Sequence, residues 1–301
     1  LGGGAAGPAA TAALRADLAR QGFYHRGPPA VIDGRAALRP LAFADGNLNG
    51  GIAETAIRLP GGVVLLPVPD ARARGGLAFG AAAEGALRIA WSPGRFLDLR
   101  GSLYAAHAPG PGVTLGGAQA EACARNHLAG WTFADLCWQA ERSYRRQSAT
   151  GSETVEASLA HLWSGRAAHH EATLAVAWRT TDGAGQPVLR AELASAFPRL
   201  ATRVGITVAG TAEGRVAERL RGFVELRARA GGGVAGLTLW AARSEGAFLG
   251  GNRRDDTLGA AVFGTLPGGL ILTVGFAETA SSVASFSGPR LTLALTRPAR
   301  D

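Results

Sequence analysis

Segments in which polar and apolar residues alternate one by one run through most of this chain. The clearest lies at 217–230, and its charged positions share one side: Arg219, Arg221, Glu225, Arg227 and Arg229. Leu220, Val224 and Leu226 fall on the other side. Only an extended strand separates these two sets, because its side chains point alternately to opposite faces. The segment therefore predicts a strand with one charged and one apolar face.

The same pattern recurs often enough to predict fourteen strands. We expect them at 36–44, 75–91, 95–107, 112–125, 131–144, 152–163, 168–180, 187–197, 200–210, 217–229, 233–243, 257–264, 268–278 and 286–297. An even number is what a single-chain bacterial barrel requires. The prediction is an all-β fold, in which residues 36–301 form a closed, antiparallel, up-and-down transmembrane β-barrel. Residues 1–35 are expected to be a tail with a short helix at 9–22, lying in the periplasm or plugging the barrel.

The connections between these strands are expected to alternate in length. The short ones are Ser92–Gly94, Asn126–Gly130, Ser164–Arg166, Pro198–Arg199, Gly231–Gly232 and Pro267. The longer ones are 45–74, 145–151, 181–186, 211–216, 244–256 and 279–285, with Pro109–Pro111 as a short exception. Outer-membrane barrels alternate in this way because their periplasmic turns are tight and their external loops are long.

A soluble β-sandwich is the alternative, since its strands also have one apolar and one polar face. Loop alternation, long strands and tryptophans near strand ends favour the membrane barrel: Trp91, Trp163 and Trp178. The sequence contains no run of eighteen apolar residues, so it predicts no transmembrane helix. We therefore expect a protein of the bacterial outer membrane that contacts its lipid.

The charge balance gives no sign of nucleic-acid binding. The net charge is +8, and all 31 basic residues are arginines. They are spread singly along the chain instead of forming a basic block, so no nucleic-acid partner is expected.

Cys123 and Cys137 are the only two cysteines, and both lie on the polar side of neighbouring strands. Adjacent antiparallel strands place such residues within bridging reach, and an oxidising periplasm favours a disulfide. Two separate buried thiols are the alternative, and both possibilities remain open. Zinc is not expected, because His127 is nearby but no four-ligand spacing is present.

Motifs for catalysis or for cofactor binding are missing from the sequence. No G-x-S-x-G elbow, H-E-x-x-H pair or phosphate loop occurs. His161, His169 and His170 lie close in sequence, but alternation sends His169 and His170 to opposite faces. We expect no enzyme activity, no catalytic residues, no cofactor and no metal.

The charged faces of the strands are expected to line the lumen of the barrel. The main candidates are Arg88, Arg100, Arg190, Arg203, Arg219, Arg221, Glu225, Arg227 and Arg229. Further acidic residues share their side: Glu84, Asp98, Glu121, Asp135, Glu141, Glu156, Glu171 and Glu192. These groups form either an electrostatic channel or a closed plug of salt bridges. Many small residues between them favour some open space, and the 45–74 loop is long enough to fold inward.

The segment Ala44-Asp45-Gly46-Asn47-Leu48-Asn49 resembles the P-D-x-N-x-N signature that opens the barrel of the surface lipoprotein assembly modifier (Slam) family. The strand at Leu77–Trp91 and the stretch Phe133–Leu136 are also similar to that family. The resemblance covers the barrel domain only, roughly 40–301, and Ala44 and Ala134 depart from the pattern. It implies a fourteen-stranded barrel that helps a lipoprotein or another protein reach the cell surface.

Three functions therefore compete. The first is translocation or surface display of a client lipoprotein or surface protein. The second is passive diffusion through a porin with an arginine-rich lumen that favours anions. The third is a non-transporting anchor for a surface assembly, in which the loop 244–256 is a candidate contact surface. The oligomeric state stays open.

Overall fold

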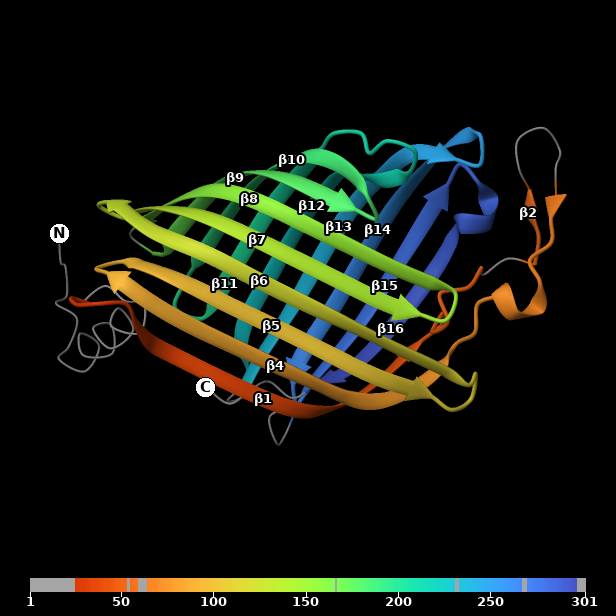
Figure 1. Ribbon diagram of the computed structural model, residues 1–301, viewed down its shortest axis with the longest axis horizontal. Helices are drawn as coiled ribbons and strands as arrows, with labels where there is room; N and C mark the ends of the chain where they lie inside the picture. Colours follow the sequence, from red (N-terminus) through yellow and green to blue (C-terminus); the bar gives the residue numbers. More distant parts are fainter. Residues whose placement is uncertain are drawn as a thin grey trace.

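The chain folds into one closed antiparallel barrel of fourteen strands (Figure 1). The computed structural model describes residues 25–52, 55–58, 64–165, 167–230, 233–266 and 270–296. Each barrel strand pairs with its neighbours in sequence order, and β1 closes the wall against β16. The expected closed barrel of fourteen strands is confirmed. The expected helix at 9–22 lies outside the described residues.

All fourteen expected strands are present, although several are longer than predicted. Their bounds are β1 Ala30–Asp45, β4 Gly76–Ser92, β5 Arg95–Ala108, β6 Val113–Ala129, β7 Thr132–Arg145, β8 Ser148–Ser164, β9 His169–Thr181, β10 Ala184–Ala196, β11 Leu200–Ala209, β12 Val216–Ala230, β13 Gly233–Phe248, β14 Gly251–Thr265, β15 Ile271–Ser281 and β16 Gly288–Thr296. Short elements lie in the connections: β2 Ile57–Arg58, β3 Val64–Leu65, η1 Pro69–Ala71 and η2 Ala284–Phe286. Among the described residues, no helix is long and apolar enough to cross a membrane.

The expected alternation of short and long connections is wrong. Two-residue turns replace three of the predicted long loops, 145–151, 181–186 and 244–256. These turns are Arg146-Gln147, Asp182-Gly183 and Leu249-Gly250. In the last two turns both residues have positive φ, the conformation of hairpin turns whose twist matches the flanking strands. Arg253, Arg254, Asp255 and Asp256 are therefore part of β14, and no loop is available there as a contact surface.

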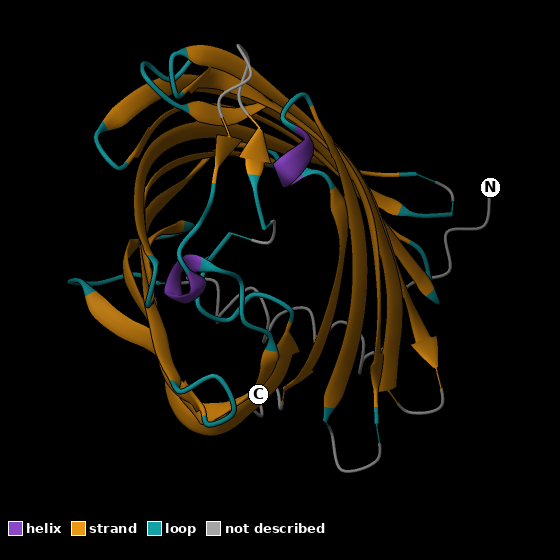
Figure 2. Ribbon diagram, turned by 90° about the vertical axis from the view of Figure 1, so that its right-hand side faces the viewer, coloured by secondary structure: helices purple, strands orange, loops and turns teal. Residues whose placement is uncertain are grey.

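The 46–75 connection marks one end of the barrel, which is called the mouth end below. It carries β2, β3 and η1 and lies at the right of Figure 1, on the same side as η2. Figure 2 looks toward this end and shows the short helices η1 and η2 and the short strands β2 and β3 at the opening.

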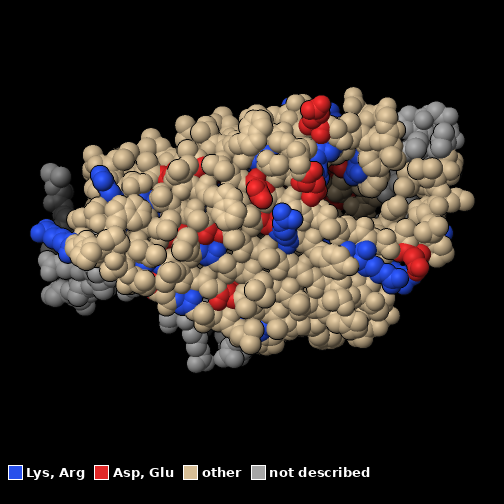
Figure 3. Space-filling model, viewed as in Figure 1, with Lys and Arg blue, Asp and Glu red and all other residues tan. Residues whose placement is uncertain are grey.

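The outward face of the wall is an apolar belt. Leucines and valines that would be buried in a soluble core are more than half exposed, among them Leu38, Leu103, Leu174, Val176, Leu258 and Leu291. In the described strands, outward charged side chains fall only near strand ends: Arg95, Arg142, Glu153, Arg243, Glu245, Arg254, Asp256 and Glu278. The surface in Figure 3 is accordingly mostly uncharged.

Candidate functional site

The inward face of β4 and β5 carries a nearly buried carboxylate between two arginines. Asp98 accepts hydrogen bonds from Arg88 Nε at 2.6 Å and Arg88 Nη2 at 2.8 Å, and lies 3.4 Å from Arg100 Nη2. Arg88 and Asp98 are register partners on adjacent strands, which brings them together without a loop. The Arg88 guanidinium also lies over the Phe96 ring, 4.4 Å from its centroid. A paired, bidentate geometry of this kind is what makes a buried charge tolerable.

A second network crosses β8, β10 and β11. Arg190 donates to Glu156 at 2.5 Å and to Glu192 at 2.7 Å. Arg203 donates to the other oxygen of Glu192 at 2.7 and 2.9 Å. Guanidinium and carboxylate groups thus alternate around the inside of the wall, as opposite charges on neighbouring strands are expected to do.

Several luminal guanidinium groups remain about half exposed, although they lie inside a closed wall. This holds for Arg100, Arg203, Arg221 and Arg227. Accessible surface at these positions means that space for water adjoins them. The side chains described here therefore do not pack into a solid plug at these positions.

The remaining predicted lumen residues, Arg219 and Arg229, lie on β12 and differ in their surroundings. Arg219 falls at a register shift between Glu218 and Leu220, and its Nη1 is buried with no hydrogen-bond partner among the described residues. Arg229 is opposite Val234 near the other end of β12. The sequence pattern gave no sign of the register shift.

Cys123 and Cys137 form a disulfide across β6 and β7. They are register partners with Cα atoms 4.1 Å apart, and both are buried on the inward face. The bond lies in the same row as Asp98, which is opposite Cys123.

A cluster at the mouth end ties the first loop to the wall, and we call it the mouth latch: Asp45, Asn47, Leu48, Asn49, Arg145 and Arg290. The Asp45 carboxylate ends β1, lies 2.5 Å from Arg290 Nη2 of β16 and lies 3.5 Å from Arg145 Nη1 of β7. Three strands therefore meet at one buried carboxylate.

The two asparagines of the latch hold the ends of the 46–75 connection together. Asn49 donates to the carbonyl of Arg72 at 2.6 Å and accepts from the N–H of Arg74 at 2.7 Å. Asn47 closes a tight turn by bonding both backbone groups of Gly51. Side-chain amides that replace backbone partners in this way are typical of turns.

Leu48 points into an inward-facing apolar cluster and is almost fully buried. The cluster consists of Leu48, Ala78, Ala106, Ala108, Val113 and Leu115. Arg145 donates to the carbonyl of Asn47 at 2.6 Å, and the N–H of Gln147 donates to the carbonyl of Asn49. The D-G-N-L-N motif thus seats the loop on β4–β6 and the β7–β8 turn. An apolar residue between turn-forming residues was the available sequence signal for this role.

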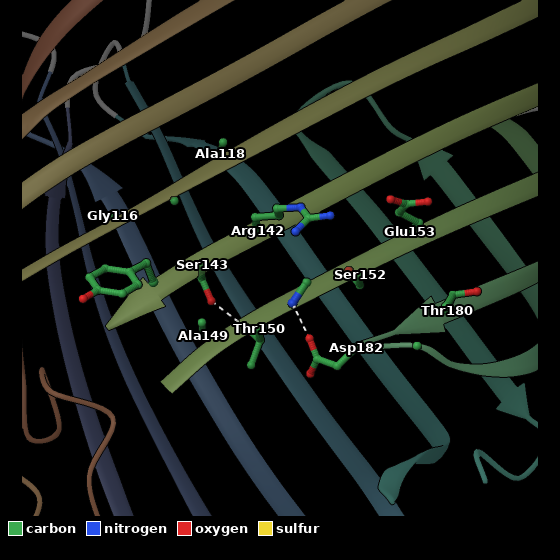
Figure 4. Close-up of a pocket in the computed structure, with 14 residues that line it drawn as sticks. Gly116, Ala118, Arg142, Ser143, Ala149, Thr150, Ser152, Glu153, Thr180 and Asp182 are labelled. Atoms are coloured by element: carbon green, nitrogen blue, oxygen red, sulfur yellow. Dashed lines mark hydrogen bonds between the residues drawn. The ribbon is translucent and has the colours of Figure 1, made fainter. Parts of the chain in front are cut away.

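A groove of about 510 Å³ lies around the mouth end of β6–β9 (Figure 4). Its close contacts are structural: Ser143 and Thr150 share a 2.7 Å hydrogen bond, and the N–H of Gly151 donates to Asp182 at 2.7 Å. That backbone hydrogen bond, aided by Arg215, holds the pKa of the Asp182 carboxyl below its usual range. The groove residues act as wall and turn supports.

The histidine cluster is divided between the two faces. His161 and His170 both stack with Trp163 on the outward face, at 6.1 and 5.3 Å between ring centroids. His169 bonds Ser164 instead. Within the described chain, no group of three His, Cys, Asp or Glu side chains is placed to hold a metal ion.

Comparison with known proteins gives no relative: no protein-family model and no curated protein matches this chain. The likeness to the Slam family therefore stays a resemblance carried by short motifs. A fourteen-stranded barrel by itself does not identify that family.

Proposed function

We propose that this chain is a barrel of the bacterial outer membrane whose water-filled lumen passes small hydrophilic solutes, with a preference for anions. The observation that carries the proposal is an asymmetry within the luminal ion pairs. The side chain of Arg203 is 44% exposed and that of its partner Glu192 is 11% exposed. Arg227 and Glu225 differ in the same direction, at 56% and 15%. At these two pairs a solute in the lumen meets the guanidinium group, with the carboxylate behind it; the Arg39–Glu84 pair is reversed, with side-chain exposures of 18% and 41%.

The apolar belt supports the membrane location. Lipid leaves no partner for unpaired backbone groups, so a spanning sheet must close on itself. Outer-membrane barrels expose an apolar band bounded by polar and aromatic residues. Here the outward charges fall near strand ends, and Trp163 stacks with His161 and His170 at the end opposite the mouth. We place the mouth end outside the cell, because long loops of such barrels are external.

Reconstitution in a planar bilayer tests the channel. Under a potassium chloride gradient, we expect the reversal potential of the parent protein to have the sign of an anion-preferring pore. The double variant Arg100→Glu/Arg203→Glu is expected to lower the chloride-to-potassium permeability ratio by roughly threefold or more, since the luminal field changes sign locally. Arg254→Glu on the outward face is the matched control and should leave the ratio unchanged. A parent without conductance, or one that prefers cations, contradicts the proposal.

A second function, assisting translocation or surface display of a protein or lipoprotein, is favoured by the seam of the barrel. β1 and β16 pair over only four register positions, from Ala42–Leu295 to Asp45–Thr292. Along its other edge, β1 pairs with β4 over nearly its whole length, from Ala30–Ala90 to Asp45–Gly76. A seam with few pairs is the place where the wall can open and offer its strand edges to another strand. This is the role that the Slam-like resemblance implies, with a client protein as the partner.

A staple across the seam separates the two functions. Ala44 and Leu293 are register partners across the seam. A disulfide formed in the double variant Ala44→Cys/Leu293→Cys would therefore lock β1 to β16. If the seam must open, cells that carry the disulfide-locked variant should lose surface-displayed protein in protease-shaving experiments and regain it when reductant is added. The conductance of the purified variant should be unaffected. The parent treated with the same reductant controls for the native disulfide. Normal display by the stapled variant argues against opening of the seam.

A further inference from the structure

The inward wall of β12–β14 carries three aromatic rings at positions where an adjacent strand has a glycine. A Cβ added at the glycine would overlap the ring in each case, so each ring lies directly on the backbone. The pairs are Phe223 on Gly205, Trp240 on Gly259 and Phe263 on Gly236. Each ring therefore lies against the backbone of the neighbouring strand, on the inward side of the wall.

Arginines border these rings. The Arg203 guanidinium lies over Phe223 at 5.3 Å from the ring centroid, and that of Arg227 lies over Phe263 at 5.8 Å. Arg221 shares the inward side of β12 with Phe223, two residues away, and is about half exposed. No cation–π contact is found for Trp240 within the described residues, and Trp240 is the register partner of Phe223. The inward wall thus carries the Trp240 indole on β13, with the guanidinium groups of Arg221 and Arg203 on the two preceding strands, β12 and β11.

From this arrangement we infer that the wall of β11–β14 is a binding site for aromatic carboxylates that enter the lumen. The inference rests on the proposed channel and names its ligand class. The ring of such a ligand stacks on Trp240, because flat apolar surfaces associate face to face with an offset. The carboxylate is held by the exposed guanidinium of Arg203 or Arg221, which forms a charge-assisted hydrogen bond. A small carboxylate without a ring uses only the second contact, and a neutral ring uses only the first.

Block of the chloride current tests the site with three probes: benzoate, acetate and benzyl alcohol. We expect benzoate to half-block the parent channel at a concentration roughly tenfold lower than either other probe, because only benzoate makes both contacts. Trp240→Leu is expected to bring benzoate within about twofold of acetate. The matched control is Trp178→Leu, since Trp178 also lies on a glycine, Gly185, but on the outward face. That control should keep the preference for benzoate.

The outcomes separate the site from the channel. A parent that conducts chloride but is blocked equally by benzoate and acetate overturns the site and leaves the channel standing. So does an unchanged benzoate preference in a folded Trp240→Leu variant, with folding checked by the β-sheet circular dichroism signal. A parent without conductance overturns the channel. Tryptophan fluorescence in detergent then tests the site alone: benzoate must quench the parent at lower concentration than acetate does, and must quench Trp240→Leu less.

Discussion

Replacing Asp98 by alanine is expected to lower the free energy of unfolding by about 3–5 kcal/mol, because it breaks a buried ion pair from one side. Asp98 is only 5% exposed and serves both Arg88 and Arg100. Its loss removes a bidentate partner from a guanidinium that is itself mostly buried. The measurement is urea unfolding of the barrel in lipid vesicles, followed by tryptophan fluorescence.

Two further variants show whether the loss comes from a stranded charge. Glu245→Ala removes a carboxylate that is 43% exposed and lies 3.9 Å from two arginines, and it should cost less than about 1 kcal/mol. Asp98→Ala/Arg88→Met removes both partners and should recover part of the loss, because no buried charge is left behind. If Asp98→Ala costs no more than Glu245→Ala, the luminal pairs do not stabilise the wall as described.

Replacing Asn49 by alanine is expected to release the 46–75 connection from the wall. Asn49 is 1% exposed, and its amide satisfies the carbonyl of Arg72 and the N–H of Arg74. Two buried backbone groups lose their partners at a cost of about 1–3 kcal/mol each. The opened state of the loop should become more populated by roughly 30-fold or more. Limited proteolysis of the loop in intact vesicles measures the change as a faster cleavage rate.

Asp70→Ala is the control for this loop. Asp70 lies in the same connection and pairs with Arg74, but both side chains are solvent-exposed. Exposed pairs contribute little, so the cleavage rate should change by less than about threefold. Equal cleavage of Asn49→Ala and the parent would mean that the mouth latch does not hold the loop.

The alternation of side chains predicted the strands well because it depends on local geometry alone. The turns were harder for a physical reason that 251–256 illustrates. This stretch reads Gly-Asn-Arg-Arg-Asp-Asp and belongs to β14, but it extends toward the mouth end beyond the apolar belt. Both faces of a strand are polar there, so alternation disappears and the segment resembles a loop. The dipeptide Asp182-Gly183 is typical of a two-residue hairpin turn, and the prediction of a longer loop at 181–186 missed it.

The lumen was predictable as a surface and not as a set of contacts. The alternation of side chains along a strand was enough to put Arg190 and Arg203 on the charged side of their strands. Glu192 is on the same strand as Arg190, but its contact with Arg203 depends on the register of β10 and β11, which the turn between them determines. The mouth latch was harder still to predict from the sequence, because Asp45 and Arg290 meet only when the last strand pairs with the first. Local patterns carry no information about that closure.

The Cys123–Cys137 bond joins residues that are only 14 positions apart and already face each other in one hairpin. A crosslink of this kind restricts a short loop of the denatured chain and does not connect distant parts of the wall. Renaturation from urea should therefore succeed with both thiols reduced, and oxidation could follow as a separate step. Reductant added to the folded barrel should leave the closed β-sheet intact.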